Sequence, residues 1–189
     1  PMGQSTPPDP QEQELGFAAE DASPEPGAGP PAEPWKVLII DDEPEVHRVT
    51  RLALMSFRMD GRPLDLQSAF SAAEGRRMLE ANPGYALIFL DVVMESDHAG
   101  LELVRFVREQ MGNRQVRIVL RTGQPGVAPQ RYVVENYDID DYRSKTELTT
   151  QRLHSTTYGA LRAYKELMRV ERLVAERTAE IEQKNAALE

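Results

Sequence analysis

The feature that most constrains the fold is a short apolar run that ends in one carboxylate, Tyr85-Ala86-Leu87-Ile88-Phe89-Leu90-Asp91. A run this apolar and this rich in β-forming residues is typical of a strand covered on both faces. In parallel α/β sheets, functional groups lie in the crevice beyond the carboxyl ends of the strands. Asp91 is therefore the first candidate for a functional residue.

Two other apolar runs also end in polar side chains. Residues 36–40 are followed by Asp41 and Asp42, and residues 116–121 are followed by Thr122. Weaker patterns predict a second strand over residues 64–70 and a short edge strand over residues 139–145. Helical spacing, caps and turn signals predict helices between these strands: residues 44–58, a helix capped by Ser71 that runs to Ala81, a helix beginning near Leu101, residues 129–136, and a last helix capped by Thr146.

Five strands that alternate with five helices indicate a parallel sheet with helices on both faces. We expect a flavodoxin-like α/β fold, (βα)5, with strand order 2-1-3-4-5 and an extended C-terminal helix. This order sets the first strand beside the third. It therefore predicts that Asp41 and Asp42 lie next to Asp91.

Over residues 35–165 the chain resembles the receiver domain of a bacterial two-component response regulator. The matching residues occur in the family's order at the ends of the expected strands: Asp41, Asp42, Asp91, Thr122, Tyr142 and Lys145. The resemblance implies that Asp91 is the phosphoacceptor, which takes a phosphoryl group from a partner sensor histidine kinase or from a small phosphodonor. It also implies that Lys145 neutralises the phosphoryl oxygens during transfer.

The resemblance further implies a Mg²⁺ cofactor. Clustered carboxylates repel one another unless a cation joins them, and Mg²⁺ prefers oxygen ligands. The implied ligands are Asp41, Asp42, Asp91 and the backbone carbonyl of Val93.

Thr122 and Tyr142 are the switch residues that the resemblance implies. In the family, the hydroxyl moves to bond a phosphoryl oxygen, and the aromatic ring turns inward behind it. The face made by the fourth helix, fifth strand and fifth helix then repacks and docks a partner or a second protomer.

Two regions depart from the family pattern. Thr146 stands where a proline usually follows the lysine, and Met94-Glu95 stands where Met-Pro is usual. Gly100 lies nine residues after Asp91 rather than eight, so the loop holding Asp97 and His98 carries one additional residue. These departures keep an alternative open, in which a degenerate receiver acts as a phosphorylation-independent dimerisation or docking module.

Two enzyme-like or cofactor-binding alternatives are disfavoured. A phosphohydrolase of the haloacid dehalogenase type needs a second Asp two residues after the nucleophile, where this chain has Val93. A flavin-binding relative needs a phosphate-cradling loop after the first strand, and none is present there. His47 and His154 fall within expected helices and are interpreted as surface residues rather than phosphoacceptors.

Composition separates a tail from the rest of the chain. Residues 1–34 hold seven acidic residues, no Lys or Arg, and nine of the fourteen prolines, so we expect a disordered tail. The chain has no cysteine, which excludes disulfides and thiolate metal sites. A net charge of -9 argues against direct nucleic-acid binding. With no membrane-spanning apolar run and no signal peptide, we expect a cytoplasmic protein.

Residues 166–189 are expected to form a signalling helix or coiled-coil linker. Apolar residues recur every seventh position: Leu153, Ala160, Leu167, Val174, Ile181 and Leu188. Asn185, on the neighbouring seam position, would favour a parallel homodimer; a solvated extension is the alternative. The segment resembles linkers that lead to an effector domain. We therefore expect a non-enzymatic fragment with a missing output domain. Diguanylate cyclases, histidine kinases and cyclic-dinucleotide phosphodiesterases often follow such linkers, and the sequence does not choose between them, although we favour a diguanylate cyclase.

Overall fold

The computed structural model describes residues 32–123, 130–145 and 149–186. Within these ranges the chain forms one parallel five-stranded sheet with strand order β2-β1-β3-β4-β5. The strands are β1 (Trp35–Ile40), β2 (Leu64–Ala69), β3 (Leu87–Asp91), β4 (Arg117–Thr122) and β5 (Asp141–Ser144). The flavodoxin-like topology predicted from the sequence is thereby confirmed.

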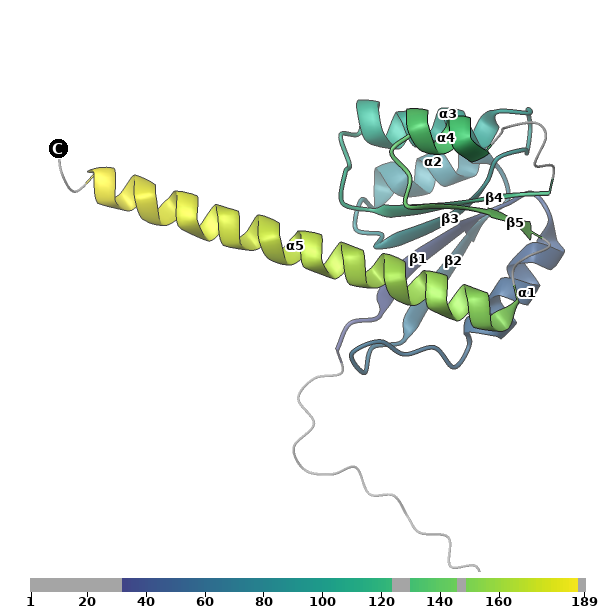
Figure 1. The fold of residues 1–189 in the computed structure, drawn as a ribbon, viewed down its shortest axis with the longest axis horizontal. Helices are drawn as coiled ribbons and strands as arrows, with labels where there is room; N and C mark the ends of the chain where they lie inside the picture. Colours follow the sequence, from purple (N-terminus) through teal and green to yellow (C-terminus); the bar gives the residue numbers. More distant parts are fainter. Residues whose placement is uncertain (1–31, 124–129, 146–148, 187–189) are drawn as a thin grey trace, which may run out of the picture. The chain divides into compact units, whose positions relative to one another are not determined.

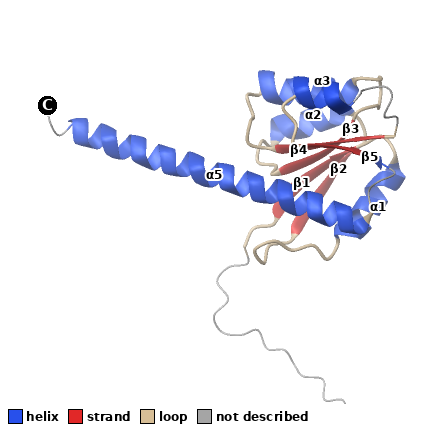
Figure 2. Ribbon diagram, viewed as in Figure 1, coloured by secondary structure: helices blue, strands red, loops and turns tan. Residues whose placement is uncertain are grey.

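Helices cover both faces of the sheet, with α2, α3 and α4 on one face and α1 and α5 on the other (Figure 1). The helices are α1 (Pro44–Leu54), α2 (Ala72–Ala81), α3 (Ala99–Arg105), α4 (Gln130–Asn136) and α5 (Thr150–Ala186). A short π-helix, η1 (Phe106–Gln110), continues α3. Figure 2 shows the same alternation of strands and helices by secondary structure.

The two faces of the sheet hold two separate apolar cores. Because successive side chains of a strand point to opposite faces, β1 and β3 contribute to both cores. Leu38, Ile40, Ile88 and Leu90 pack under α2 and α3, whereas Val37, Ile39 and Phe89 pack with Leu54 of α1 and Leu161 of α5. Burial on both faces accounts for the nearly continuous apolar sequence of these two strands.

The first helix is shorter than predicted, and it buries polar side chains. It ends at Leu54 rather than at residue 58. Val49 and Leu52 are 46% and 64% exposed, whereas His47 and Thr50 are buried. These two polar residues can be buried because their side chains find hydrogen-bond partners within the domain.

His47 was predicted to lie at the surface, and that prediction is wrong. Its Nε2 lies 2.7 Å from the backbone oxygen of Asp41, and its Nδ1 lies 2.9 Å from Ser68 Oγ. The ring thus ties α1 to the end of β1 and to β2. His154 is half-buried, with its Nε2 2.7 Å from the backbone oxygen of Ala53.

The cap predicted for the second helix is confirmed. Ser71 Oγ accepts a hydrogen bond from the Glu74 amide at 3.1 Å, and the Glu74 carboxylate accepts one from the Phe70 amide at 2.7 Å. Such reciprocal bonds satisfy amides that the first helical turn leaves unpaired. Thr146, predicted to cap the last helix, lies outside the described residues; the Arg152 amide donates to Thr149 Oγ1 at 3.3 Å.

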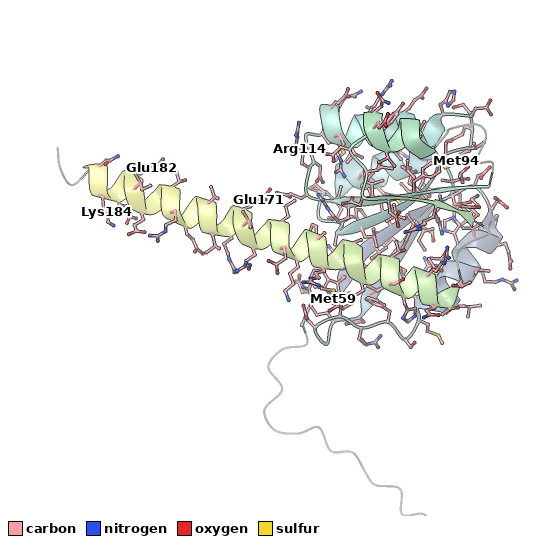
Figure 3. All side chains as sticks on the ribbon, viewed as in Figure 1. Met59, Met94, Arg114, Glu171, Glu182 and Lys184 are labelled. Carbon is pink, nitrogen blue, oxygen red and sulfur yellow. The ribbon has the colours of Figure 1, made fainter. Side chains whose placement is uncertain are left out.

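Only the first part of α5 packs on the sheet. Leu153, Thr157, Ala160 and Leu161 are buried. The first two residues of the predicted heptad series, Leu153 and Ala160, therefore pack against the chain's own domain. Along residues 172–186 almost every side chain is exposed, including the apolar Val174 and Ile181. Figure 3 shows this charged outer part of the helix, with Glu171, Glu182 and Lys184 labelled. Among the described residues, no helix is long and apolar enough to cross a membrane.

Candidate functional site

Three strands deliver the predicted site residues to one edge of the sheet. Ile40 pairs with Leu90, so the residues that follow, Asp41 and Asp91, leave neighbouring strands side by side. Lys145 comes directly after β5 at the same edge. The sequence therefore predicts correctly that the carboxylates and the lysine converge, because the carboxyl ends of all strands in a parallel sheet lie at the same edge.

Lys145 joins the acids into one cluster. Its Nζ lies 2.8 Å from Asp91 Oδ2, 3.2 Å from Asp41 Oδ1 and 2.6 Å from Glu43 Oε1. Burial acts to lower the pKa of Lys145, but the hydrogen bonds to Asp91 and Glu43 and the nearby negative charges outweigh it and raise that pKa. The lysine is therefore a permanent cation at this site.

Four acidic side chains form a cluster whose carboxylate oxygens lie close together. One carboxylate oxygen from each of Asp41, Asp42, Glu43 and Asp91 lies within 4.8 Å of the others. Asp41 Oδ2 and Asp91 Oδ1 are buried and have no hydrogen-bond partner among the described residues. Unpartnered buried carboxylate oxygens fit a hard divalent cation such as Mg²⁺, which prefers oxygen ligands. The arrangement offers no position to thiolate or imidazole ligands.

Glu43 is a member of this cluster that sequence reasoning missed. It directly follows the Asp pair and is the N-cap residue of α1, while its amide donates to Asp41 Oδ1 at 3.0 Å. The signal was present in the sequence, since Glu43 directly follows the Asp pair and precedes a proline that favours the first helical position.

Asp91 is nearly fully buried, with 2% of its surface exposed. Burial raises the pKa of its carboxyl group, the hydrogen bond from Lys145 lowers it, and the negative charge of Asp41 raises it, so that the net shift is upward. Two buried carboxylates this close repel each other in the cation-free state. A bound cation would therefore stabilise the charged form of both carboxylates.

Gly100 fixes the loop that follows Asp91. A Cβ atom at Gly100 would lie 2.0 Å from the backbone oxygen of Asp91, so only glycine fits there. Its amide donates to the Val92 carbonyl at 3.0 Å. Asp97 and His98, in the same loop, are exposed.

Glu95 gives the altered loop a second attachment. Its carboxylate accepts a hydrogen bond from the Ala73 amide at 3.4 Å, near the start of α2. Backbone hydrogen bonds at this helix start outweigh the effect of burial and lower the pKa of Glu95. A carboxylate is favoured at a helix N-terminus, so the departure from the family's Met-Pro pattern still produces an anchored loop.

The two predicted switch residues lie together in the structure. Thr122 ends β4 and is fully buried, and Tyr142 in the neighbouring β5 is 5% exposed. Burial raises the pKa of Tyr142, while a side-chain hydrogen bond with Thr122 acts in the opposite direction. The aromatic ring belongs to the core under α2 and α3. Their role in switching stays a prediction, as does the Val93 carbonyl as a ligand.

Arg121 is the second functional candidate that sequence reasoning missed. It is fully buried beside the acids, with its Nη2 3.6 Å from Asp41 Oδ2. The available signal was a charged residue directly after the apolar residues 118–120 and directly before Thr122.

Comparisons with known proteins bear on the fold of the domain. No family model matches the chain. The 3′3′-cGAMP-specific phosphodiesterase 2 of Vibrio cholerae serotype O1 is 52% identical over 139 residues, which cover 74% of this chain. The chain spans only 27% of the length of that phosphodiesterase.

Several solved structures that are similar to this chain are receiver domains. A response regulator receiver domain from Clostridium thermocellum superposes with a TM-score of 0.57 at 22% identity, covering 70% of this chain and 98% of that one. The receiver domain of an HD domain-containing protein from Pseudomonas fluorescens Pf-5 gives a TM-score of 0.62 at 17% identity, covering 76% and 98%. The receiver domain of a putative Luxo repressor protein from Vibrio parahaemolyticus gives 0.61 at 16% identity, covering 73% and 98%. The described domain therefore has the fold of response regulator receiver domains, as the sequence resemblance predicts.

Proposed function

We propose that this chain is a phosphoacceptor receiver, in which Asp91 takes a phosphoryl group with the help of Mg²⁺. The observation that carries the proposal is the pair of unpartnered buried oxygens, Asp41 Oδ2 and Asp91 Oδ1, beside Lys145. Asp41 can thus offer an oxygen to a cation, and Asp91 can act as the nucleophile. Both lie at the carboxyl ends of the strands, where parallel α/β folds place their functional groups.

In the proposed reaction, a carboxylate oxygen of Asp91 attacks the phosphorus of a phosphohistidine or of acetyl phosphate. The new P–O bond forms as the bond to the donor breaks, and the donor's imidazole or acetate leaves with the electron pair. Mg²⁺, when bound by Asp41, Asp42 and Asp91, supplies positive charge to the phosphoryl oxygens. Lys145, already 2.8 Å from Asp91 Oδ2, supplies a further cation to the same oxygens.

The product carries a larger negative charge, of roughly -1.5 to -2, at the buried end of β3. Thr122 is the hydroxyl that would follow the phosphoryl group, with Tyr142 packed behind it. A change at this pair would reach α4, β5 and α5, because Tyr142 lies in β5. From there, α5 would transmit the signal as a homodimer through its exposed outer part.

The test of acceptor chemistry is intact mass after incubation with acetyl phosphate. A Mg²⁺-dependent gain of one phosphoryl group, absent in Asp91→Asn, is the expected result. Asp97→Asn is the matched control, because Asp97 lies exposed in the next loop. Labelling of the Asp91→Asn protein at the wild-type level would refute the assignment.

The donor protein is proposed to be a sensor histidine kinase that docks beside α1. This helix begins directly after the acids and exposes Val49, Leu52 and Met55 on one side, with 46%, 64% and 73% exposed. Such an apolar side next to an acceptor site fits a protein partner. Leu52→Glu should lower transfer from a kinase that phosphorylates the wild type, while labelling by acetyl phosphate stays unchanged. An equal loss with both donors would contradict docking on α1.

For the output, the comparisons favour a cyclic-dinucleotide phosphodiesterase over the diguanylate cyclase that the sequence led us to expect. The relative at 52% identity is a 3′3′-cGAMP-specific phosphodiesterase. Expression of the full reading frame, with hydrolysis of 3′3′-cGAMP measured for the wild type and for Asp91→Asn, tests this proposal. No hydrolysis would remove the phosphodiesterase, and equal hydrolysis by both proteins would remove control by Asp91.

One observation favours the docking-module alternative. Tyr142 is buried and shares a hydrogen bond with Thr122. A domain fixed in this arrangement would have the same oligomeric state with and without beryllofluoride, a mimic of the phosphoryl group. A change in sizing on beryllofluoride addition would exclude this alternative.

A further inference from the structure

Arg121 carries a charge at a fully buried position of β4. It lies in β4, paired with Asp91 of β3, and none of its surface is exposed. Strand alternation puts it on the same face as Val119 and Phe89, under α1 and α5. Thr122 and Tyr142 act on the other side of the sheet, so Arg121 is not part of the switch pair.

The guanidinium group is anchored but incompletely paired. Its Nη1 donates to Thr50 Oγ1 at 2.9 Å, and Thr50 Oγ1 in turn donates to the Val46 carbonyl at 2.7 Å. Its charge centre lies 5.3 Å from the centroid of the Phe89 ring. Nε and Nη2 have no hydrogen-bond partner among the described residues, and Nη2 lies 3.6 Å from the equally unpartnered Asp41 Oδ2.

A buried cation with unpaired N–H groups is costly, unless nearby negative charge compensates for its lost hydration. Burial lowers the pKa of Arg121, and the negative charges of Asp41 and Asp91 oppose that shift only in part, so the acid cluster supplies partial compensation. Lys145 approaches the same cluster from the solvent-facing side, with 13% of its side chain exposed. Arg121 is fully buried and donates to Thr50, whereas the side chain of Lys145 is partly exposed.

We propose that Arg121 is a built-in counter-ion that stabilises the cation-free acid cluster and thereby weakens its binding of divalent cations. The inference rests on the proposed Mg²⁺ site. The cluster has four carboxylates and two basic groups, so Arg121 offsets part of the charge that would attract a cation. Its Nη2 also lies 3.6 Å from Asp41 Oδ2, one of the two unpartnered buried oxygens that we propose as cation ligands.

The test is the Mg²⁺ affinity of the whole chain, measured by isothermal titration calorimetry. Arg121→Gln removes the charge and should tighten Mg²⁺ binding about tenfold or more, because one fixed charge within several ångströms of a divalent ion has at least this effect. Arg121→Lys keeps the charge, and Thr50→Val removes only the anchoring hydroxyl. Both controls should stay within about threefold of the wild type.

Thermal unfolding with and without Mg²⁺ gives an independent readout. Arg121→Gln should unfold at a lower temperature than the wild type without Mg²⁺ and should be stabilised more strongly by Mg²⁺. If the wild type binds Mg²⁺ and Arg121→Gln binds it no more tightly, the counter-ion role is refuted while the receiver proposal stands. If the wild type itself binds no Mg²⁺, both proposals fail. An Arg121→Gln protein that stays unfolded at every Mg²⁺ concentration would show a purely structural role instead.

Discussion

Replacing Gly100 with alanine should separate the cost of a blocked close approach from the ordinary effect of alanine in a helix. Alanine in a helix interior is favoured over glycine by about 0.5–1 kcal/mol. At Gly100, however, the added Cβ would lie 2.0 Å from the backbone oxygen of Asp91, where contacts under 3.0 Å do not occur. The neighbour is the backbone at the end of a fully buried strand, so relief requires β3 or the start of α3 to move.

Overpacking of a well-packed interior costs roughly 1–3 kcal/mol, and a clash with backbone belongs at the upper end. We therefore expect Gly100→Ala to lower the free energy of unfolding by about 2 kcal/mol, which is about 4–8 °C in Tm for a domain of this size. Phosphorylation of Asp91 should slow as well, because the displaced backbone carries that residue. Urea unfolding and acetyl phosphate labelling measure the two effects.

Gly159→Ala is the matched control. Gly159 also lies inside a helix, but a Cβ there meets nothing within 4 Å, so the substitution should stabilise the protein by about 0.5–1 kcal/mol. Opposite signs for the two substitutions are the expected result. A Gly100→Ala protein as stable as the wild type would refute the close approach on which the loop geometry depends.

Three further predictions concern the cluster and the last helix. Asp42→Ala should weaken Mg²⁺ binding at least about tenfold by calorimetry, through loss of one carboxylate next to the ion, and unchanged affinity would remove Asp42 from the ligand set. In Mg²⁺-free urea unfolding at neutral pH, Asp91→Asn should be more stable than the wild type, because burial and Asp41 raise the pKa of Asp91 despite its bond to Lys145. Between the unfolded and the raised folded pKa of Asp91, the folded state binds more protons than the unfolded state. The stability difference between Asp91→Asn and the wild type should therefore shrink as the pH falls through the raised pKa. A stability difference that does not depend on pH would contradict the raised pKa as its cause. Deletion of residues 172–189 should leave Tm unchanged, since their described side chains are almost all exposed, while sizing should show loss of any dimer; a lower Tm would mean that this segment packs on the domain.

The sheet and its functional edge could be predicted from the sequence because the central strands are apolar on both faces. The runs before Asp41 and Asp91 have this property, and parallel pairing then places both acids at one edge. Lys145 followed from the same rule. The expected flavodoxin-like strand order, 2-1-3-4-5, is also the order in the structure.

The buried polar groups could not be predicted in the same way. In the first helix the apolar Val49 and Leu52 are exposed, whereas the polar His47 and Thr50 are buried. Those polar residues are buried because Asp41, Ser68 and Arg121 offer partners from other strands, and such long-range partners leave no trace in local spacing. Arg121 was missed for the same reason, since its compensating charge lies 80 residues earlier in the chain, at Asp41.

The measurement that tests the central claim most directly is the intact mass of the wild type after incubation with acetyl phosphate, with and without Mg²⁺, beside Asp91→Asn. The account predicts a gain of one phosphoryl group in the wild type that requires Mg²⁺ and disappears in Asp91→Asn. Beryllofluoride binding, followed by calorimetry, checks a wild type that does not react with this donor. Absence of both labelling and beryllofluoride binding would contradict the assignment of Asp91 as a phosphoacceptor.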